Sequence, residues 1–253
     1  MNANLENSGV ALVTGSGRRL GRAIAIDLAE AGYDIAVHYN GSADAAREVV
    51  AHIEKLGRRA VAFQYDLTEA EGAGALVKQA VAQLGPVNVL INSAAIFDED
   101  SIESLSPESW HRLMNVNLAA PVFLMQAFAH QQPVPENAAI VNILDTQMTS
   151  AYPERLSYFC AKFGLEGATK VAAFDLAGKG ITVNAIAPGL ILPSGQTVEE
   201  FTRRQRLMPL GDGLGADDIA SAVRYLISAR QVTGHTLVVD AGQRLMGMGN
   251  MGT

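Results

Sequence analysis

The amino-acid sequence predicts an α/β fold: one doubly wound, mostly seven-stranded parallel sheet with helices on both faces. Short apolar runs alternate with longer segments in which apolar residues recur at helical spacing. Strands that are apolar throughout are typical of a parallel sheet, and right-handed crossovers place the connecting helices on both faces. The runs expected as strands are 10–15, 34–39, 60–65, 87–92, 138–144, 181–187 and 236–240. The segments expected as helices are 20–31, 43–56, 72–84, 108–129, 158–177 and 217–228.

The length and composition favour a single domain. With 253 residues, of which 49% are hydrophobic and 18% charged, the chain can bury a large core and has too little polar excess for a long disordered region. No linker rich in proline, glycine or serine divides it. We therefore expect residues 1–253 to form one domain, with a flexible segment at 1–8 and an irregular substrate loop at about 188–215.

The charge and cysteine content disfavour several classes of protein. The formal net charge is −7, so nucleic acid and anionic membrane surfaces are not expected as partners. The single cysteine, Cys160, allows neither an internal disulfide nor a multi-cysteine metal site, and no metal is expected. The polar stretch 1–9 does not resemble a signal peptide, and no apolar run reaches the roughly 18 residues of a membrane span. We expect a cytoplasmic protein.

A glycine-rich turn, TGSGRRLG at 14–21, joins the first expected strand to the first expected helix. Glycines let the backbone turn tightly under a pyrophosphate, which then lies on the free N–H groups and the positive end of the helix dipole. Because a strand and a helix flank the turn, we expect it to bind a dinucleotide and not to be an ordinary tight turn. The residues expected at the cofactor are Gly15, Arg18, Arg19, Leu20 and Gly21.

The end of the second expected strand favours NADPH over NADH. Sites that prefer NADH place an Asp or Glu there to bind the ribose hydroxyls, and such an acid would repel a 2′-phosphate. This chain has HYNGS at 38–42 and therefore no acid in that stretch. Arg18 and Arg19 in the nearby turn suit the phosphate, although both can also be solvated surface charges. The further residues expected at the cofactor are His38, Asn40 and Ser42.

A tyrosine and a lysine lie four residues apart in YFCAK, at Tyr158 and Lys162. On a helix this spacing places both side chains on one face. A phenol has a pKa of about 10 and needs a nearby cation to exchange protons at neutral pH. The pair is common on surface helices, but here it follows a dinucleotide turn and a strand, 140–144, whose carboxyl end opens onto the same crevice. We therefore expect the pair to be catalytic.

Over essentially its whole length the chain resembles the short-chain dehydrogenases/reductases, which have a Rossmann-type fold. The motifs that carry the resemblance are the TG…G turn, NSAA at 92–95 (the family's NNAG), Asn117, the YxxxK pair, PG at 188–189 and VDAG at 239–242. The resemblance implies an NADPH-dependent oxidoreductase that assembles as a homotetramer. It also implies cofactor contacts at Asp66, Leu67, Asn92, Ser93, Ala94, Tyr158, Lys162, Pro188 and Gly189.

The resemblance implies a role for each residue of the catalytic set. Tyr158 donates or accepts the substrate proton, while Lys162 holds the nicotinamide ribose and lowers the pKa of Tyr158. Asn117 holds a water in a proton relay from solvent. Asp66 contacts adenine, and Asn92 lines the cofactor pocket.

Three departures from the common family pattern resemble the pteridine reductases and the short-chain dihydromonapterin and dihydrofolate reductases. Asp145 stands 13 positions before Tyr158, where most of the family has a serine. Arg19 replaces the middle glycine of the turn, and Phe97 follows the NNAG-like stretch. The segment at 38–42 also resembles theirs, although Gly41 stands where many of them have an arginine.

These departures indicate a pterin or folate substrate. Asp145 can hydrogen-bond to the ring and help Tyr158 pass a proton to it, and Phe97 can stack on one face of the ring. We expect NADPH to deliver hydride to a C=N carbon of a dihydromonapterin, dihydrobiopterin or dihydrofolate type substrate. The residues expected at the substrate are Phe97, Asp145, Tyr158 and Arg19.

Other interpretations stay open. Phe97 can be a core residue, and Asp145 can be a residue that only caps a loop. The same scaffold can reduce a ketone or 3-oxoacyl substrate, with Thr146 or another hydroxyl replacing the lost serine. A nucleotide-binding protein without catalysis would be expected to have lost the Tyr158–Lys162 pair, and that pair is intact.

Overall fold

The computed structural model describes residues 8–149, 154–193, 195–211 and 213–246. Within these residues one seven-stranded sheet has the order β3-β2-β1-β4-β5-β6-β7, and each neighbouring pair is parallel. This confirms the predicted fold class. The strands are β1 (Val10–Val13), β2 (Asp34–Tyr39), β3 (Ala60–Gln64), β4 (Val87–Asn92), β5 (Ala139–Ile143), β6 (Thr182–Pro188) and β7 (Thr236–Val239).

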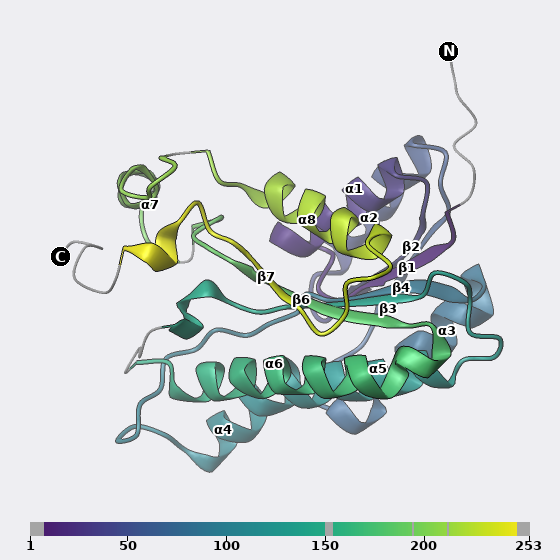
Figure 1. Cartoon of the computed structure of the whole chain (residues 1–253), viewed down its shortest axis with the longest axis horizontal. Coiled ribbons are helices and arrows are strands. Elements are labelled where there is room, and N and C mark those ends of the chain that lie inside the picture. Colours follow the sequence, from purple (N-terminus) through teal and green to yellow (C-terminus); the bar gives the residue numbers. More distant parts are fainter. Residues whose placement is uncertain (1–7, 150–153, 194, 212, 247–253) are drawn as a thin grey trace.

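Helices cover both faces of the sheet, as predicted. The α-helices of the described residues are α1 (Arg19–Glu30), α2 (Ala43–Lys55), α3 (Ala75–Leu84), α4 (Pro107–Met114), α5 (Ala120–His130), α6 (Leu156–Leu176), α7 (Val198–Arg206) and α8 (Ala216–Ser228). Figure 1 shows α1, α2 and α8 above the sheet and α3, α5 and α6 below it. The sheet is therefore the middle of three layers.

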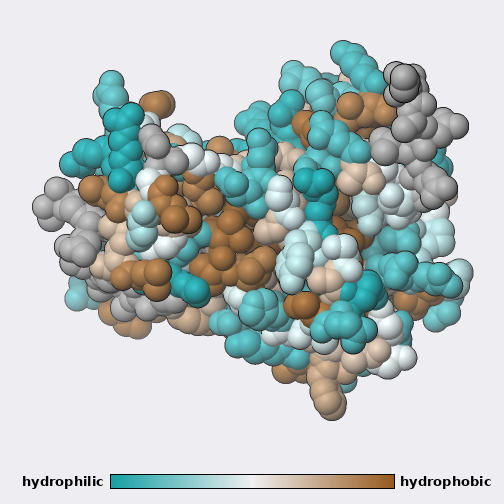
Figure 2. All heavy atoms as spheres, turned by 45° about the horizontal axis from the view of Figure 1, so that its top comes forward, coloured by the Kyte–Doolittle hydropathy of each residue, from teal (hydrophilic) through white to brown (hydrophobic). Residues whose placement is uncertain are grey.

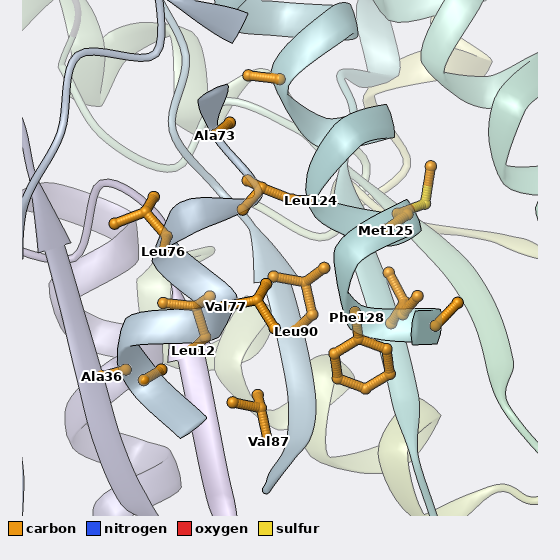
Figure 3. Close-up of a cluster of buried hydrophobic side chains, with 14 of the residues drawn as sticks. Leu12, Ala36, Ala73, Leu76, Val77, Val87, Leu90, Leu124, Met125 and Phe128 are labelled. Atoms are coloured by element: carbon orange, nitrogen blue, oxygen red, sulfur yellow. The ribbon is translucent and has the colours of Figure 1, made fainter. Parts of the chain in front are cut away.

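Apolar side chains on both faces of the sheet fix the helices to it. Toward α3 and α5, Leu12 and Leu90 of the sheet pack with Leu76 and Phe128 of the helices, all fully buried (Figure 3). Val13, the next residue after Leu12, belongs to the core on the opposite face, because side chains alternate along a strand. Burial of a side chain of this size contributes about 1.5–3 kcal/mol, so the layers hold the strand ends in fixed positions.

The helix predicted over 108–129 is divided into three segments. α4 ends at Met114, a π-helical turn, η2 (Asn115–Ala119), follows, and α5 begins at Ala120. Pro121 lies in the first turn of α5 and has no N–H for the carbonyl of residue 117, so the regular α-helical ladder is broken there. Insertions of this kind are frequent at functional sites.

The segment predicted as an irregular loop, 188–215, contains a helix that the sequence prediction missed. α7 begins after Thr197, whose Oγ accepts a hydrogen bond from the Glu200 N–H at 3.2 Å. Its first turn carries two acids and its last turn three arginines, which complements the helix dipole at both ends. This charge order is a helix signal, but it is masked by the prolines and glycines on either side.

The predicted flexible segment, 1–8, lies outside the described residues except for Ser8. Ser8 donates from its N–H to the Gly32 carbonyl at 3.1 Å and from Oγ to the Ala31 carbonyl at 3.0 Å. In the described part of the chain, no helix has both the length and the apolar character needed to cross a membrane.

The strand order reverses direction at β1, which lies between β2 and β4. The connections that follow β1 and β4 therefore diverge and leave a crevice at the carboxyl ends of the strands, where ligands bind in open α/β sheets. Figure 2 shows hydrophobic side chains gathered in a hollow between raised parts of the surface.

Candidate active site

A cavity of about 530 Å³ opens at the carboxyl ends of the central strands. It brings together most of the residues predicted for the cofactor and the substrate, from positions spread along the chain. The predicted residues that line it are Gly15, Arg18, Arg19, Leu20, Gly21, His38, Asn40, Asp66, Leu67, Ser93, Ala94, Phe97, Asp145, Tyr158, Lys162, Pro188 and Gly189.

Three predicted residues belong to the described part of the chain but are not among the lining residues: Ser42, Asn92 and Asn117. Asn92 donates from Nδ2 to Oδ1 of Asn142 at 2.8 Å inside the sheet. Asn117 is fully buried in the π-helical turn; it accepts from the Ile96 N–H at 3.1 Å and donates to the Ile96 carbonyl at 3.0 Å. The Asn117 amide therefore fixes the backbone at Ile96, and the Asn92 amide joins β4 to β5.

The sequence prediction missed a second group of lining residues. Many of them are apolar side chains of the segments that follow β4, β5 and β6, where hydrophobic residues gave no functional signal. They are Thr68, Ala95, Ile96, Arg112, Val116, Ile143, Leu144, Gln147, Leu190, Ile191, Leu192 and Gln243.

The glycine-rich turn presents the N-terminus of α1 to the cavity. Gly15 has a φ of +66°, and a Cβ on Gly21 would lie 2.5 Å from the Gly15 carbonyl oxygen, so both positions require glycine. Arg18, at the start of α1, caps no backbone N–H with its side chain, and the first turn carries no acid. The free N–H groups and the helix dipole therefore favour an anion at this point.

Arg19 adopts a backbone conformation that normally requires glycine. Its φ is +53°, which costs an L-residue roughly 1–2 kcal/mol. Its guanidinium donates from Nη2 to the carbonyl oxygen of Pro193 at 2.8 Å. Arg19 thus ties the glycine-rich turn to the segment after β6, across one side of the cavity.

The His38 side chain forms a hydrogen bond with the backbone of the glycine-rich turn. Its Nδ1 accepts the Gly15 N–H at 3.0 Å, and Nε2 lies 3.1 Å from the carbonyl oxygen of Tyr65, to which it donates. These partners fix the neutral tautomer with the proton on Nε2. Burial lowers the pKa of His38, which keeps the ring neutral at physiological pH.

Near the glycine-rich turn the cavity is lined by Asp66 and Thr68, with Ser42 close by but outside the lining. Asp66 accepts from the N–H and the hydroxyl of Thr68 at 2.9 and 2.8 Å, and these bonds lower the pKa of Asp66 and keep it ionised. A Cβ placed on Gly17 would lie 3.1 Å from Ser42 Oγ, so the Ser42 hydroxyl is beside the glycine-rich turn.

Tyr158, Lys162 and Asp145 meet at the inner end of the cavity. The Tyr158 hydroxyl donates to Oδ2 of Asp145 at 3.1 Å. Lys162 Nζ donates to the Ile143 carbonyl at 2.8 Å and lies 5.5 Å from the centroid of the Tyr158 ring. Tyr158 and Lys162, both in α6, are nearly fully buried, so they interact with Asp145 in a medium of low dielectric constant.

The electrostatics of this group differ from the expectation for Tyr158. Burial, followed by the nearby Asp145 carboxylate, raises the pKa of Tyr158 well above its ordinary value, and the charge that lowers it belongs to Arg155. The expected lowering by Lys162 is therefore not found. Burial raises the pKa of Asp145 and lowers that of Lys162 to about 8. The phenol and the carboxyl both hold protons more tightly than they do in water.

Phe97 and Arg155 cover the outer side of the tyrosine. The Phe97 ring meets the Tyr158 ring edge to face, with 4.6 Å between centroids. The Arg155 guanidinium lies 3.7 Å from the Phe97 centroid, and its Nη1 donates to the Phe97 carbonyl at 2.8 Å. Phe97 is 37% exposed, so it is not a core residue. Nothing in the sequence marked Arg155, because this contact joins residues 58 positions apart.

The fold and the site define a dinucleotide-dependent oxidoreductase architecture, and the comparisons with known proteins agree. The family model described as enoyl-(acyl carrier protein) reductase matches residues 15–244. A 3-oxoacyl-[acyl-carrier-protein] reductase, FabG, of Staphylococcus epidermidis is 36% identical over 238 residues, which are 92% of this chain and 97% of that protein. The chain belongs to the short-chain dehydrogenase/reductase family.

Two similar solved structures carry names other than 3-oxoacyl reductase. FolM alternative dihydrofolate reductase 1 from Brucella canis, complexed with NADP, is 36% identical with a TM-score of 0.89, covering 96% of each chain. A blue fluorescent protein from a metagenomic library, in complex with NADPH, is 35% identical with a TM-score of 0.85, covering 95% of this chain and 99% of that one. The resemblance to reductases of the pteridine type is therefore confirmed.

Proposed function

We propose that this chain is an NADPH-dependent reductase of a pterin C=N bond, in which Tyr158 and Asp145 supply the proton. The observation that carries the proposal is the hydrogen bond between the Tyr158 hydroxyl and Asp145 inside the cavity. A carboxyl group at this position can both donate and accept, as the nitrogens and the amide edge of a pterin require. The solved FolM dihydrofolate reductases support the same substrate class.

The residues present fit NADPH. The anion site at the start of α1 suits the pyrophosphate. Asn40, Asp66, Lys162 and Tyr158 line the same cavity. No acid lies at 38–42, whereas Arg18, Arg19 and Ser42 are close to the turn that would face the 2′-phosphate. We propose that Lys162 binds the nicotinamide ribose and that the predicted lining residues hold the cofactor.

NADPH, when bound, would supply the hydride for the new C–H bond at the C=N carbon. Tyr158 transfers its hydroxyl proton to the adjacent nitrogen, so that the C=N bond becomes a C–N single bond with a new N–H. The phenolate then recovers a proton from solvent by way of Asp145: the carboxyl passes a proton to the phenolate oxygen and takes up another from water. Burial, which raises the pKa of Asp145, favours the protonated form that this transfer needs. Phe97 offers its exposed area to one face of the ring.

A carbonyl or 3-oxoacyl reductase is the second candidate, because curated relatives at 36% identity carry that name. In that reading Thr146 would replace the serine hydroxyl. However, Thr146 Oγ donates to Oδ2 of Asp240 at 2.9 Å, and Thr146 is buried and is not itself among the residues that line the cavity. This contact favours the pterin over the ketone. A non-catalytic nucleotide-binding protein has no use for the assembled group of Tyr158, Lys162 and Asp145.

The test is a panel of substrates with the purified protein. NADPH consumption is measured with dihydromonapterin, dihydrobiopterin and dihydrofolate, and in parallel with an acetoacetyl thioester and simple ketones. The proposal expects turnover of at least one pterin or folate by the wild-type protein. The Tyr158→Phe variant serves as the inactive control. Turnover confined to the carbonyl compounds would overturn the proposal in favour of the second candidate.

We also propose a homotetramer in the cytoplasm. One face of α6 exposes Phe163, Val171 and Phe174 by 50, 68 and 89%, which supports a contact between copies of the chain along this helix. Light scattering of the purified protein tests the assembly, and a monomer would contradict it. Cell fractionation tests the location.

A further inference from the structure

Asp100 is a buried carboxylate in an otherwise exposed or half-exposed segment. From residue 93 to residue 112, all of which are described, only Asp100 is buried, at 4% exposure. Its neighbours on either side are more accessible, so burial of this charge is not a by-product of a buried segment. Removing a carboxylate from water is costly unless it forms specific hydrogen bonds. The partners of Asp100 therefore indicate what it does.

The partners of Asp100 are at the start of α6. Its Oδ1 accepts from the Ser157 N–H at 3.0 Å, its carbonyl accepts from the Leu156 N–H at 3.2 Å, and its own N–H donates to the Glu154 carbonyl at 3.0 Å. Arg155, which precedes the helix, makes no side-chain cap. The cap that a helix usually takes from its own N-terminal residue is thus supplied by a loop 57 positions earlier.

This cap lies directly beside Tyr158. α6 begins at Leu156, so Tyr158 is the third residue of the first turn. The first N–H groups of a helix have no partner within the helix, and helix ends fray unless something binds them. A tyrosine in a fraying first turn would not keep its hydroxyl 3.1 Å from Asp145. A buried carboxylate at this end also interacts favourably with the helix dipole.

The segment that carries Asp100 also carries Phe97. Arg155 continues the contact between the two segments: its guanidinium donates to the Phe97 carbonyl and from Nη2 to Glu99 at 2.9 Å. The same set of bonds therefore fixes the aromatic ring over the cavity and the start of the helix that bears the tyrosine.

We propose that Asp100 is a positioning residue: it closes the open N-terminus of α6 and by this means holds Tyr158 in register with Asp145. The proposal rests on the catalytic role of Tyr158 but not on the identity of the substrate. It applies equally if the enzyme reduces carbonyl compounds, so its test can be separated from that of the pterin assignment.

The experiment compares Asp100→Ala, Asp100→Asn and Ser106→Ala. Ser106 caps α4 through the Ser109 N–H at 3.1 Å, so its replacement removes a helix cap without removing a hydrogen bond to the first turn of α6 and serves as the matched control. Two quantities are measured: amide hydrogen exchange in the first turn of α6, which needs no substrate, and kcat, KM and the NADPH Kd with the substrate class that supports turnover.

The proposal expects Asp100→Ala to speed exchange in the first turn of α6 and to lower kcat by about tenfold to 100-fold, with KM and NADPH Kd nearly unchanged. Asp100→Asn keeps an oxygen that can accept the Ser157 N–H, and it should retain protection and most of kcat. Ser106→Ala should change neither quantity. Unchanged exchange in Asp100→Ala, or faster exchange with wild-type kcat, would overturn the proposal.

If Asp100→Ala does not fold, the Asp100→Asn variant is used to test the proposal. The proposal expects this variant to retain both the protection of the first turn and most of kcat, because its amide oxygen keeps the cap; loss of both would contradict that expectation. A loss of kcat with full protection of the first turn would overturn the proposal, because the charge and not the cap would then be what the reaction needs.

Discussion

The hydroxyl of Tyr158 donates a hydrogen bond to Oδ2 of Asp145 over 3.1 Å. Tyr158 lies in the first turn of α6 and Asp145 in the segment that follows β5, and the two residues meet in the cavity. Burial raises the pKa of both groups, so the pair holds its protons at a higher pH than either group would in water. Such a pair is suited to begin a reaction as an acid.

Replacing Tyr158 by Phe removes the proposed proton donor and leaves the ring in place. We expect kcat to fall by at least about 100-fold, whereas the NADPH Kd should stay within about twofold of the wild-type value. Steady-state kinetics and fluorescence titration with NADPH measure the two effects. Tyr225→Phe, on the exposed face of α8, is the control and should behave as the wild type. Wild-type turnover in Tyr158→Phe would contradict the assignment.

The buried Lys162 predicts a characteristic dependence of stability on pH in the cofactor-free protein. Burial lowers its pKa from 10.5 to about 8. Below about pH 8 both the folded and the unfolded state carry the charge, so the folded state bears the full cost of burying it. Between about pH 8 and 10.5 the folded lysine loses its proton while the unfolded one keeps it, so this cost falls as the pH rises.

Wild type should therefore gain stability relative to Lys162→Met across that window, by up to about 1.4 kcal/mol per pH unit. Urea unfolding at a series of pH values gives the difference in the free energy of unfolding between the two proteins. A difference that stays constant from neutral to alkaline pH would contradict the lowered pKa.

Arg19 is expected to reduce stability while serving the substrate side of the cavity. Arg19→Gly removes the left-handed conformation of a non-glycine residue and should stabilise the fold by about 1 kcal/mol. It also removes the bond to the Pro193 carbonyl, so the segment after β6 loses one attachment and substrate KM should rise. Thermal unfolding and kinetics measure the two changes. A loss of stability, or an unchanged KM, would contradict this account of Arg19.

Gly41 offers a direct test of the phosphate side. A side chain added there meets nothing within 4 Å, and arginine at this position should approach the 2′-phosphate of NADPH. We expect Gly41→Arg to tighten NADPH binding by about tenfold and to leave NADH binding unchanged. Gly178→Arg, at an equally open position outside the cavity, adds the same charge as a control. Equal effects of both variants would indicate a general charge effect and contradict a local contact.

The sequence predicted the layers of the fold because apolar periodicity depends on which face of each element is buried. It also predicted that Tyr158, Lys162 and Asp145 belong to one site, since each lies at the carboxyl end of the sheet or on the helix that follows. The π-helical turn at 115–119 and the helix α7 were missed. In the first case a proline interrupts a helical pattern, and in the second a helix-like order of charges lies between prolines. Local signals of opposite meaning cannot be resolved without knowledge of the packing.

Contacts between loops and the values that depend on burial could not be predicted. Arg155 and Asp100 act through partners 57 or 58 positions away, and no spacing rule links such residues. The pKa of Tyr158 was expected to fall because Lys162 is one helical turn away. In the folded protein burial and Asp145 raise this pKa, and the cation that opposes them is Arg155; burial depends on the whole surrounding structure.

The most direct test of the central claim is the ratio of kcat/KM for a dihydropterin to kcat/KM for an acetoacetyl thioester, measured in the wild type and in Asp145→Ser. The claim is that Asp145 selects the pterin. The wild type should therefore favour the dihydropterin, and Asp145→Ser should lower its turnover by at least about 100-fold while gaining activity on the thioester. A ratio that is the same in both proteins, or a wild type that turns over only the thioester, would contradict the claim.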